Sequence, residues 1–157
     1  MPINSKKKGN RTELELSKIL SERFNQTFKR TPQSGAWSTF NRNSNVREDA
    51  MEILAGDIIT PADFKFSIEC KSRQDFNFWD LLSEDNPNLE IKEWLFQVEH
   101  DASISGKEPL LYVKVNNRKP FVMIPRRLYE GKVTYGDYTI LRFDYFLQFE
   151  DDFFFKE

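Results

Sequence analysis

The sequence contains very few of the residues that build disulfides and zinc centres. It has one cysteine, Cys70, and one histidine, His100, among 157 residues. A lone cysteine cannot form an internal disulfide, and neither residue has the companions that a zinc site needs. We therefore interpret Cys70 as a core residue and His100 as a surface residue. The cysteine count is typical of a reducing compartment.

Long apolar segments are missing as well. No stretch approaches the roughly 20 consecutive apolar residues of a membrane-spanning helix. Residues 1–8 carry three consecutive lysines, and the apolar run of a secretory signal does not follow them. No glycine-rich Walker sequence occurs, and no histidine stands at triad spacing from Ser34 or Ser38, which disfavours nucleotide hydrolases and serine hydrolases. We expect a cytoplasmic, intracellular protein with no membrane partner.

The composition is that of one folded domain with polarised charge. At this length, with 39% apolar residues and 15 phenylalanines, the chain can build one core. We expect a single domain over residues 1–157, of which residues 1–8 are a flexible basic tail. Residues 1–47 hold ten Lys or Arg against three Glu, whereas residues 144–157 hold five acids against one lysine. The basic third favours contact with phosphates, although a solvated helix face explains it equally well.

Hydrophobic periodicity predicts an α/β fold with a mixed β-sheet flanked by helices. Apolar residues three and four apart, among them Ile19, predict a helix that follows Gly9-Asn10 and ends before Lys29. The same spacing predicts a second helix within residues 89–105, and a short helix is expected near Trp79. Alternating residues predict strands, the first two joined as a hairpin, at residues 53–60, 64–72, 110–115 and 121–125.

The second predicted strand has one apolar and one polar face, so Glu69 and Lys71 project to the same side. Asp57 lies in the preceding segment among apolar residues. A charge in such surroundings is costly unless it is paired or binds a metal. Phosphodiester hydrolysis needs charge neutralisation at phosphorus and an activated water, and Mg²⁺ held by oxygen ligands supplies both. Asp57, Glu69 and the Cys70 carbonyl are candidate ligands, and Mn²⁺ is the expected substitute.

A Glu-x-Lys pattern alone is common on solvated strand faces, so four stretches together carry more weight. They are Lys8-Gly9-Asn10-Arg11-Thr12-Glu13-Leu14-Glu15-Leu16, Arg30-Thr31-Pro32-Gln33-Ser34-Gly35-Ala36, Gly56-Asp57-Ile58-Ile59 and Ile68-Glu69-Cys70-Lys71. In this order the chain resembles the PD-(D/E)XK nucleases, and among them the archaeal-type Holliday junction resolvases and their phage relatives. The resemblance implies a restriction-endonuclease-like core.

The resemblance also implies roles for individual residues. Glu13 would be a further metal or water ligand beside Asp57 and Glu69, with Glu15 as its rival, and Lys71 would be the catalytic lysine. Ser34 matches a loop serine near the scissile phosphate, and Gln97 matches a glutamine on the helix after the core strand. Both have ordinary structural explanations as well. Candidate DNA contacts are Lys8, Arg11, Arg30, Arg42, Arg47 and Arg73.

These patterns and the resemblance favour a magnesium-dependent DNA endonuclease, a Holliday junction or branched-DNA resolvase of phage origin. The resemblance, and the need to cut two symmetric strands, imply a homodimer. The phenylalanine-rich carboxyl end is the candidate dimer interface. One alternative is a restriction-like or nicking endonuclease that acts on linear duplex DNA. A second alternative is a DNA-binding module of the same fold without catalysis.

Overall fold

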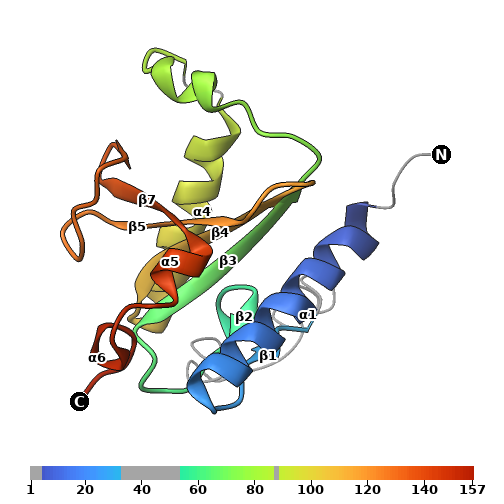
Figure 1. Cartoon of the computed structure of the whole chain (residues 1–157), viewed down its shortest axis with the longest axis vertical. Coiled ribbons are helices and arrows are strands. Elements are labelled where there is room, and N and C mark those ends of the chain that lie inside the picture. Colours follow the sequence, from blue (N-terminus) through green and yellow to red (C-terminus); the bar gives the residue numbers. More distant parts are fainter. Residues whose placement is uncertain (1–4, 33–53, 87–88) are drawn as a thin grey trace.

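The computed structural model describes residues 5–32, 54–86 and 89–157. Its elements in chain order are α1 (Ser5–Phe24), β1 (Lys29–Arg30), β2 (Ile58–Ile59), β3 (Phe66–Arg73), the 3-10 helix η1 (Phe78–Leu82), α4 (Glu90–Ser105), β4 (Glu108–Val115), β5 (Phe121–Pro125), β6 (Thr134–Tyr135), β7 (Tyr138–Arg142), α5 (Phe143–Phe146) and α6 (Asp151–Phe154). The expected α/β architecture is confirmed (Figure 1). Among the described helices, none is both long and apolar enough to cross a membrane.

Five strands form one mixed sheet in the order β3-β4-β5-β7-β6. β3 and β4 run parallel, and α4 connects them along the chain. The other neighbours in this sheet are antiparallel. β3 is therefore an edge strand, with one side of its backbone free of any partner strand in this sheet. β1 and β2 form a separate antiparallel pair.

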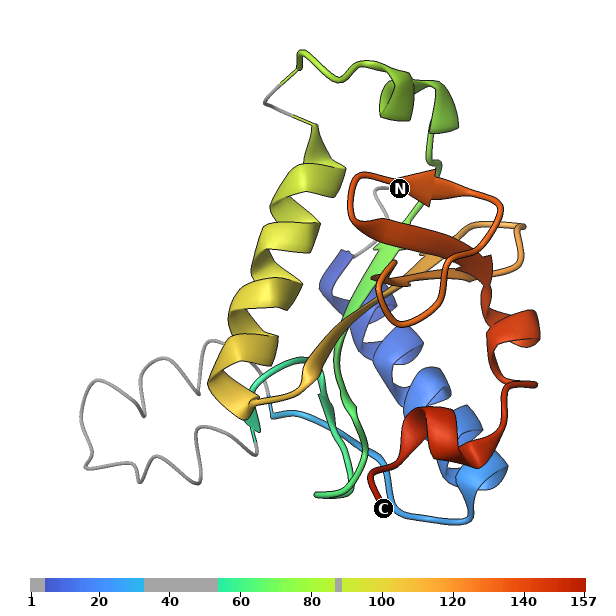
Figure 2. The ribbon, with the colours of Figure 1, turned by 90° about the vertical axis from the view of Figure 1, so that its left-hand side faces the viewer.

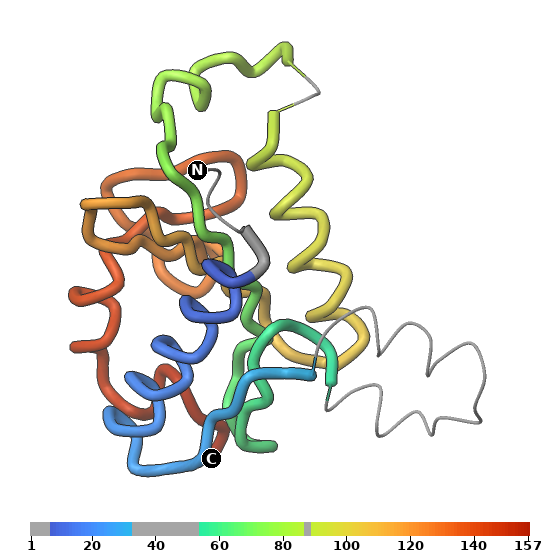
Figure 3. Tube along the Cα trace, turned by 90° about the vertical axis from the view of Figure 1, so that its right-hand side faces the viewer, coloured from blue at the N-terminus to red at the C-terminus, as the bar shows by residue number. Residues whose placement is uncertain are grey.

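Two hydrophobic cores lie on the two faces of the sheet. Leu110 and Tyr112 of β4 belong to the core that also contains Leu16 and Leu20 of α1. Residues of the opposite parity on β4, such as Leu111, belong to the core that contains the buried face of α4. Figures 2 and 3 show α1 and α4 on opposite sides of β3. Successive side chains of β3 therefore alternate between the α1 side and the α4 side of the sheet.

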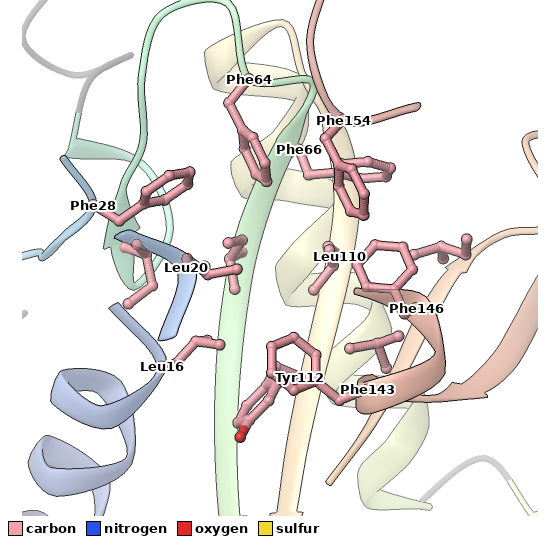
Figure 4. Packing of buried hydrophobic residues seen from close by; sticks show 14 of the residues in the cluster. Leu16, Leu20, Phe28, Phe64, Phe66, Leu110, Tyr112, Phe143, Phe146 and Phe154 are labelled. Atoms are coloured by element: carbon pink, nitrogen blue, oxygen red, sulfur yellow. The ribbon is translucent and has the colours of Figure 1, made fainter. Parts of the chain in front are cut away.

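The carboxyl-terminal phenylalanines complete the core on the α1 side. Phe146 of α5 is 1% exposed and Phe154 of α6 is fully buried. The Phe154 ring centroid lies 4.8 Å from that of Phe24 and 5.0 Å from that of Phe146. Figure 4 shows Phe146 and Phe154 among the residues of this core. The prediction that this end of the chain supplies a dimer interface is therefore wrong for these rings, because they are buried against their own chain.

The predicted hairpin of residues 53–60 and 64–72 is also wrong. β2 contains only Ile58–Ile59 and pairs with β1, while β3 pairs with β4. Gly56 has φ +85°, which interrupts the extended conformation just before Asp57. Periodicity shows that a segment is extended and which face is buried, but it does not identify the partner strand.

The remaining predictions of secondary structure are largely confirmed. The helix over residues 89–105 and the strands over 110–115 and 121–125 are present, and His100 is exposed as expected. α1 begins at Ser5, so residues 5–8 are helical and not a flexible tail. Ile19 was expected on the buried face of α1, but it is 38% exposed, because the residues that reach the sheet are spaced by four.

Candidate active site

Asp57 is held against the free edge of β3 by two hydrogen bonds. Its backbone N–H donates to the Ile68 carbonyl over 2.8 Å. Its Oδ2 accepts from the Cys70 backbone N–H over 2.7 Å. The carboxylate thus occupies the place that a partner strand's carbonyl would take, and it satisfies an edge donor of the sheet.

Gly56 allows this approach. A Cβ atom at this position would lie 2.9 Å from both the Ile68 carbonyl oxygen and the Ser67 Oγ. Its positive φ is a conformation that side-chain-bearing residues rarely adopt. The Gly-Asp sequence is therefore explained by geometry, because the glycine brings the aspartate to the strand edge.

Glu69 and Lys71 extend from β3 toward α4. Phe66 and Ile68, of the other parity, are buried in the core on the α1 side. Glu69 is 3% exposed, and its Oε2 atom has no hydrogen-bond partner among the described residues. Lys71 Nζ lies 3.6 Å from Glu69 Oε1 and donates to Gln97 Oε1 over 2.9 Å. The structure thus brings Gln97 of α4 to the candidate catalytic lysine.

The electrostatics of this group favour a bound cation. Burial raises the pKa of both Asp57 and Glu69, and the negative charge of Asp57 raises the pKa of Glu69 further. The Cys70 N–H and the Lys71 ammonium act in the opposite direction on Asp57. A buried carboxylate with an unpartnered oxygen is costly unless a proton or a cation compensates it.

The oxygen donors present fit a hard divalent cation. Within the described parts of the chain, no three His, Cys, Asp or Glu side chains are grouped so as to hold a metal ion by themselves. Asp57 and Glu69 are two acidic donors, however, and Mg²⁺ usually keeps several waters beside one or two carboxylates. The Cys70 carbonyl faces the same strand edge as the Cys70 N–H that binds Asp57, so it is available as a third oxygen ligand.

The sequence matches the protein-family model described as "Phage putative PDDEXK endonuclease" over residues 4–153. The chain belongs to this family. The mixed sheet flanked by helices is its restriction-endonuclease-like core, as expected. Membership makes the protein a nuclease of the phage type, in a superfamily that typically uses divalent metals. No curated protein and no solved structure matches the chain.

In this PDDEXK endonuclease, Glu13 of α1 lies on the Asp57 side of the site. Its charge contributes to the raised pKa of Asp57, whereas its rival Glu15 is exposed. Glu13 Oε2 also accepts a hydrogen bond from Arg30 Nε over 2.7 Å, and Arg30 donates a second one to Asn10. If Glu13 is a metal or water ligand, its carboxylate therefore also accepts the hydrogen bond from Arg30.

The candidate DNA contacts differ in their availability. Arg11 is exposed on α1, but Arg30 is engaged by Glu13. The Arg73 guanidinium lies 4.8 Å from the centroid of the Trp94 ring and 3.3 Å from a Glu90 carboxylate oxygen. Phosphate contacts by Arg30 or Arg73 would compete with these internal partners. Lys8 lies on α1, and the other candidates, Ser34, Arg42 and Arg47, lie outside the described residues.

The sequence alone did not identify Asp101, an acidic residue beside the site. Burial is the main cause of the raised pKa of Glu69, and the negative charge of Asp101 on α4 raises it further. Asp101 follows Gln97 by four residues, so both lie on one face of the helix. That spacing was the available signal, but it becomes informative only when α4 is known to pack on β3.

Proposed function

We propose that this nuclease is a magnesium-dependent endodeoxyribonuclease that hydrolyses phosphodiester bonds in branched DNA, with Holliday junctions as its expected substrate. The observation that carries the proposal is the carboxylate pair at the edge of β3, where Asp57 is fixed beside a buried Glu69 that has an unpartnered oxygen. The branched substrate rests on the resemblance of the sequence stretches to junction resolvases.

Asp57, Glu69 and the Cys70 carbonyl would hold the cation in this site. When bound, a divalent cation neutralises charge at the scissile phosphate and lowers the pKa of a coordinated water. Lys71 lies on the same face as Glu69, and its ammonium would orient the attacking water and stabilise its deprotonated form. Gln97 holds Lys71 in place through the 2.9 Å hydrogen bond. Glu13 would position a water on the α1 side of the site.

We propose that the whole chain works as one nuclease domain. Residues of α1 and α4 lie beside the catalytic residues of β3, and the carboxyl-terminal phenylalanines pack in the core on the α1 side of this strand. Exposed basic residues such as Arg11 would contact phosphates without reading the sequence. A homodimer would cut two symmetric strands of a junction, and sedimentation at micromolar concentration tests this state.

Cleavage of end-labelled DNA tests the proposal. Four-way junction, flap and linear duplex are incubated with Mg²⁺ or Mn²⁺ and with native protein, Asp57→Asn or Lys71→Ala. We expect the junction to be cut by native protein and by neither variant, and EDTA to abolish cutting. The matched control is Lys114→Ala, which removes a lysine of β4 that bonds backbone carbonyls away from the site.

Each other result points to a specific correction. Cutting of linear duplex alone would replace the resolvase assignment by a restriction-like or nicking endonuclease. DNA binding without cleavage of any substrate would favour a binding module that keeps the fold. Junction cleavage that survives Asp57→Asn would refute the assignment of the site itself.

A further inference from the structure

The most exposed large apolar side chains of the described residues lie at one groove. They are Trp79, Leu82 and Phe96, which are 76%, 70% and 74% exposed. Leu82 of η1 and Phe96 of α4 line a groove of about 860 Å³ together with Tyr135 of β6. Residues three apart in a 3-10 helix share one face, so Trp79 extends the apolar surface beside Leu82. Single exposed apolar residues are ordinary, but a group of them marks an interaction surface.

This η1–α4 groove lies apart from the catalytic site. Figures 1 and 2 show η1 beyond the amino end of α4. Leu95 and Tyr138 also line the groove, and both are buried members of the core on the α4 side, so its base is part of the packed domain. None of the proposed catalytic residues lines it. A molecule bound in the groove therefore leaves the edge of β3 accessible to DNA.

The charge around the groove is negative. Residues 78–86, which contain η1, hold three acids and no base. Three acids line the groove itself: Glu84, Glu99 and Asp137. The two bases that line it are already engaged, because Lys92 Nζ donates to two backbone carbonyls and Arg126 forms an ion pair with a neighbouring glutamate. The exposed apolar side chains are therefore surrounded by uncompensated negative charge.

This charge selects among the molecules that could cover the apolar side chains. DNA is unsuitable, because its phosphates would be repelled by the surrounding acids. A symmetric contact between two copies of this chain would bring the same negative surface together with itself. Like charges across an interface suppress such pairings, whereas opposite charges favour association. The groove therefore fits a partner that carries apolar side chains and positive charge together.

We propose that the η1–α4 groove binds an amphipathic segment of another protein, with apolar side chains that contact Leu82 and Phe96 and with lysine or arginine beside them. A helix presents such anchors on one face, at spacings of three and four residues. Trp79 at the margin of the groove adds a side chain of the type that dominates many interfaces. The inference is independent of the proposed nuclease activity, because the groove and the catalytic site share no residue.

A designed peptide serves as the probe in a nuclear magnetic resonance titration of the isotope-labelled full chain. The peptide is a helix of about 15 residues, with leucine at spacings of three and four and lysine elsewhere. The control peptide carries glutamate in place of every lysine. We expect the lysine peptide to shift the backbone amide signals of the groove residues, with a Kd that rises with salt concentration. The glutamate peptide should shift none of them.

Two variants and a matched control locate the contact. Leu82→Ser and Phe96→Ser should each weaken binding of the lysine peptide about tenfold, because each removes an apolar anchor. Leu14→Ser is the control, since Leu14 is 57% exposed on α1, across the sheet from the groove, and its replacement should leave the Kd unchanged. All three side chains are exposed, so circular dichroism should show a folded chain in each case.

Several results would overturn the inference. Equal binding of the two peptides, shifts confined to residues outside the groove, or an unchanged Kd for Phe96→Ser would each do so. A native dimer that Phe96→Ser converts to a monomer in sedimentation would assign the groove to a second copy instead. Shifts of the groove amides on addition of duplex DNA would assign it to nucleic acid. Failure of the nuclease proposal differs from all of these, because DNA then stays uncut while the peptide still binds.

Discussion

Replacing Gly56 by alanine should damage the site by displacing Asp57. The new Cβ would lie 2.9 Å from the Ile68 carbonyl oxygen and from Ser67 Oγ, a separation that real Cβ atoms essentially never show. The residue would also have to keep φ +85°. Because Ile68 O is a backbone atom of β3, the loop that carries Asp57 must move away from the strand.

The free energy of unfolding should fall by the sum of three contributions. A side chain in the left-handed region costs about 1–2 kcal/mol. Weakening the hydrogen bond from Asp57 N–H to Ile68 O costs about 1 kcal/mol, and the bond of the carboxylate to Cys70 N–H about 1.5–3 kcal/mol if it is lost. A loss of about 3.5–6 kcal/mol corresponds to roughly 7–24 °C in melting temperature for a chain of this size. A shift of Asp57 by about 1 Å would lower the cleavage rate about 100-fold.

Thermal unfolding followed by circular dichroism in EDTA measures the first effect, and junction cleavage in Mg²⁺ the second. Gly106→Ala and Gly136→Ala are matched controls, because both glycines have positive φ and neither has an atom within 4 Å of an added Cβ. They should lose only the strain of about 1–2 kcal/mol and keep full cleavage. Equal losses in all three variants would refute the reasoning, because strain alone would then explain Gly56.

Three other perturbations have expected outcomes. Phe154→Ala should lower the free energy of unfolding by about 3–5 kcal/mol in denaturant titration, because it leaves a cavity in the core on the α1 side; a loss below 1 kcal/mol would contradict that packing. Gln97→Ala should leave the melting temperature unchanged, because the side chain is exposed, and should slow cleavage about tenfold by releasing Lys71; unchanged cleavage would argue against this role. Burial, and then the like charge of Lys156, lower the pKa of Lys107 from 10.5 to about 8. Between pH 8 and pH 10.5 the unfolded chain therefore binds more protons than the folded chain. The free energy of unfolding of native protein, relative to that of Lys107→Met, should rise over this range, and a constant difference would contradict the prediction.

Patterns within single segments were sufficient to predict the helices and strands and part of the site. The two-residue period of β3 placed Glu69 and Lys71 on one face, and the helical spacing of Ile91, Trp94 and Val98 gave the buried face of α4. Both patterns depend on geometry within one element, where residues two apart or three to four apart share a face whatever the rest of the chain does. The four motif stretches also identified the family, which the match over residues 4–153 shows.

Pairing between distant segments could not be predicted in this way. The segment before β3 has the sequence of a strand, yet Gly56 turns it so that β2 pairs with β1 and Asp57 meets the edge of β3. The aromatic carboxyl end has the composition of an interface, yet Phe146 and Phe154 fill the core of their own chain. In each case several partners could satisfy the same local pattern, and the packing of the whole chain selects one.

The sequence by itself thus determined which residues are extended or helical, which acids and which lysine share a strand face, and the family. The tertiary structure decided what stands opposite them. It set Asp57 at the strand edge, Glu13 beside Arg30, and Gln97 and Asp101 along α4 against Lys71 and Glu69. The physical reason is that these contacts join residues far apart in the chain, whose meeting depends on sheet order and helix packing and not on the period of any one segment.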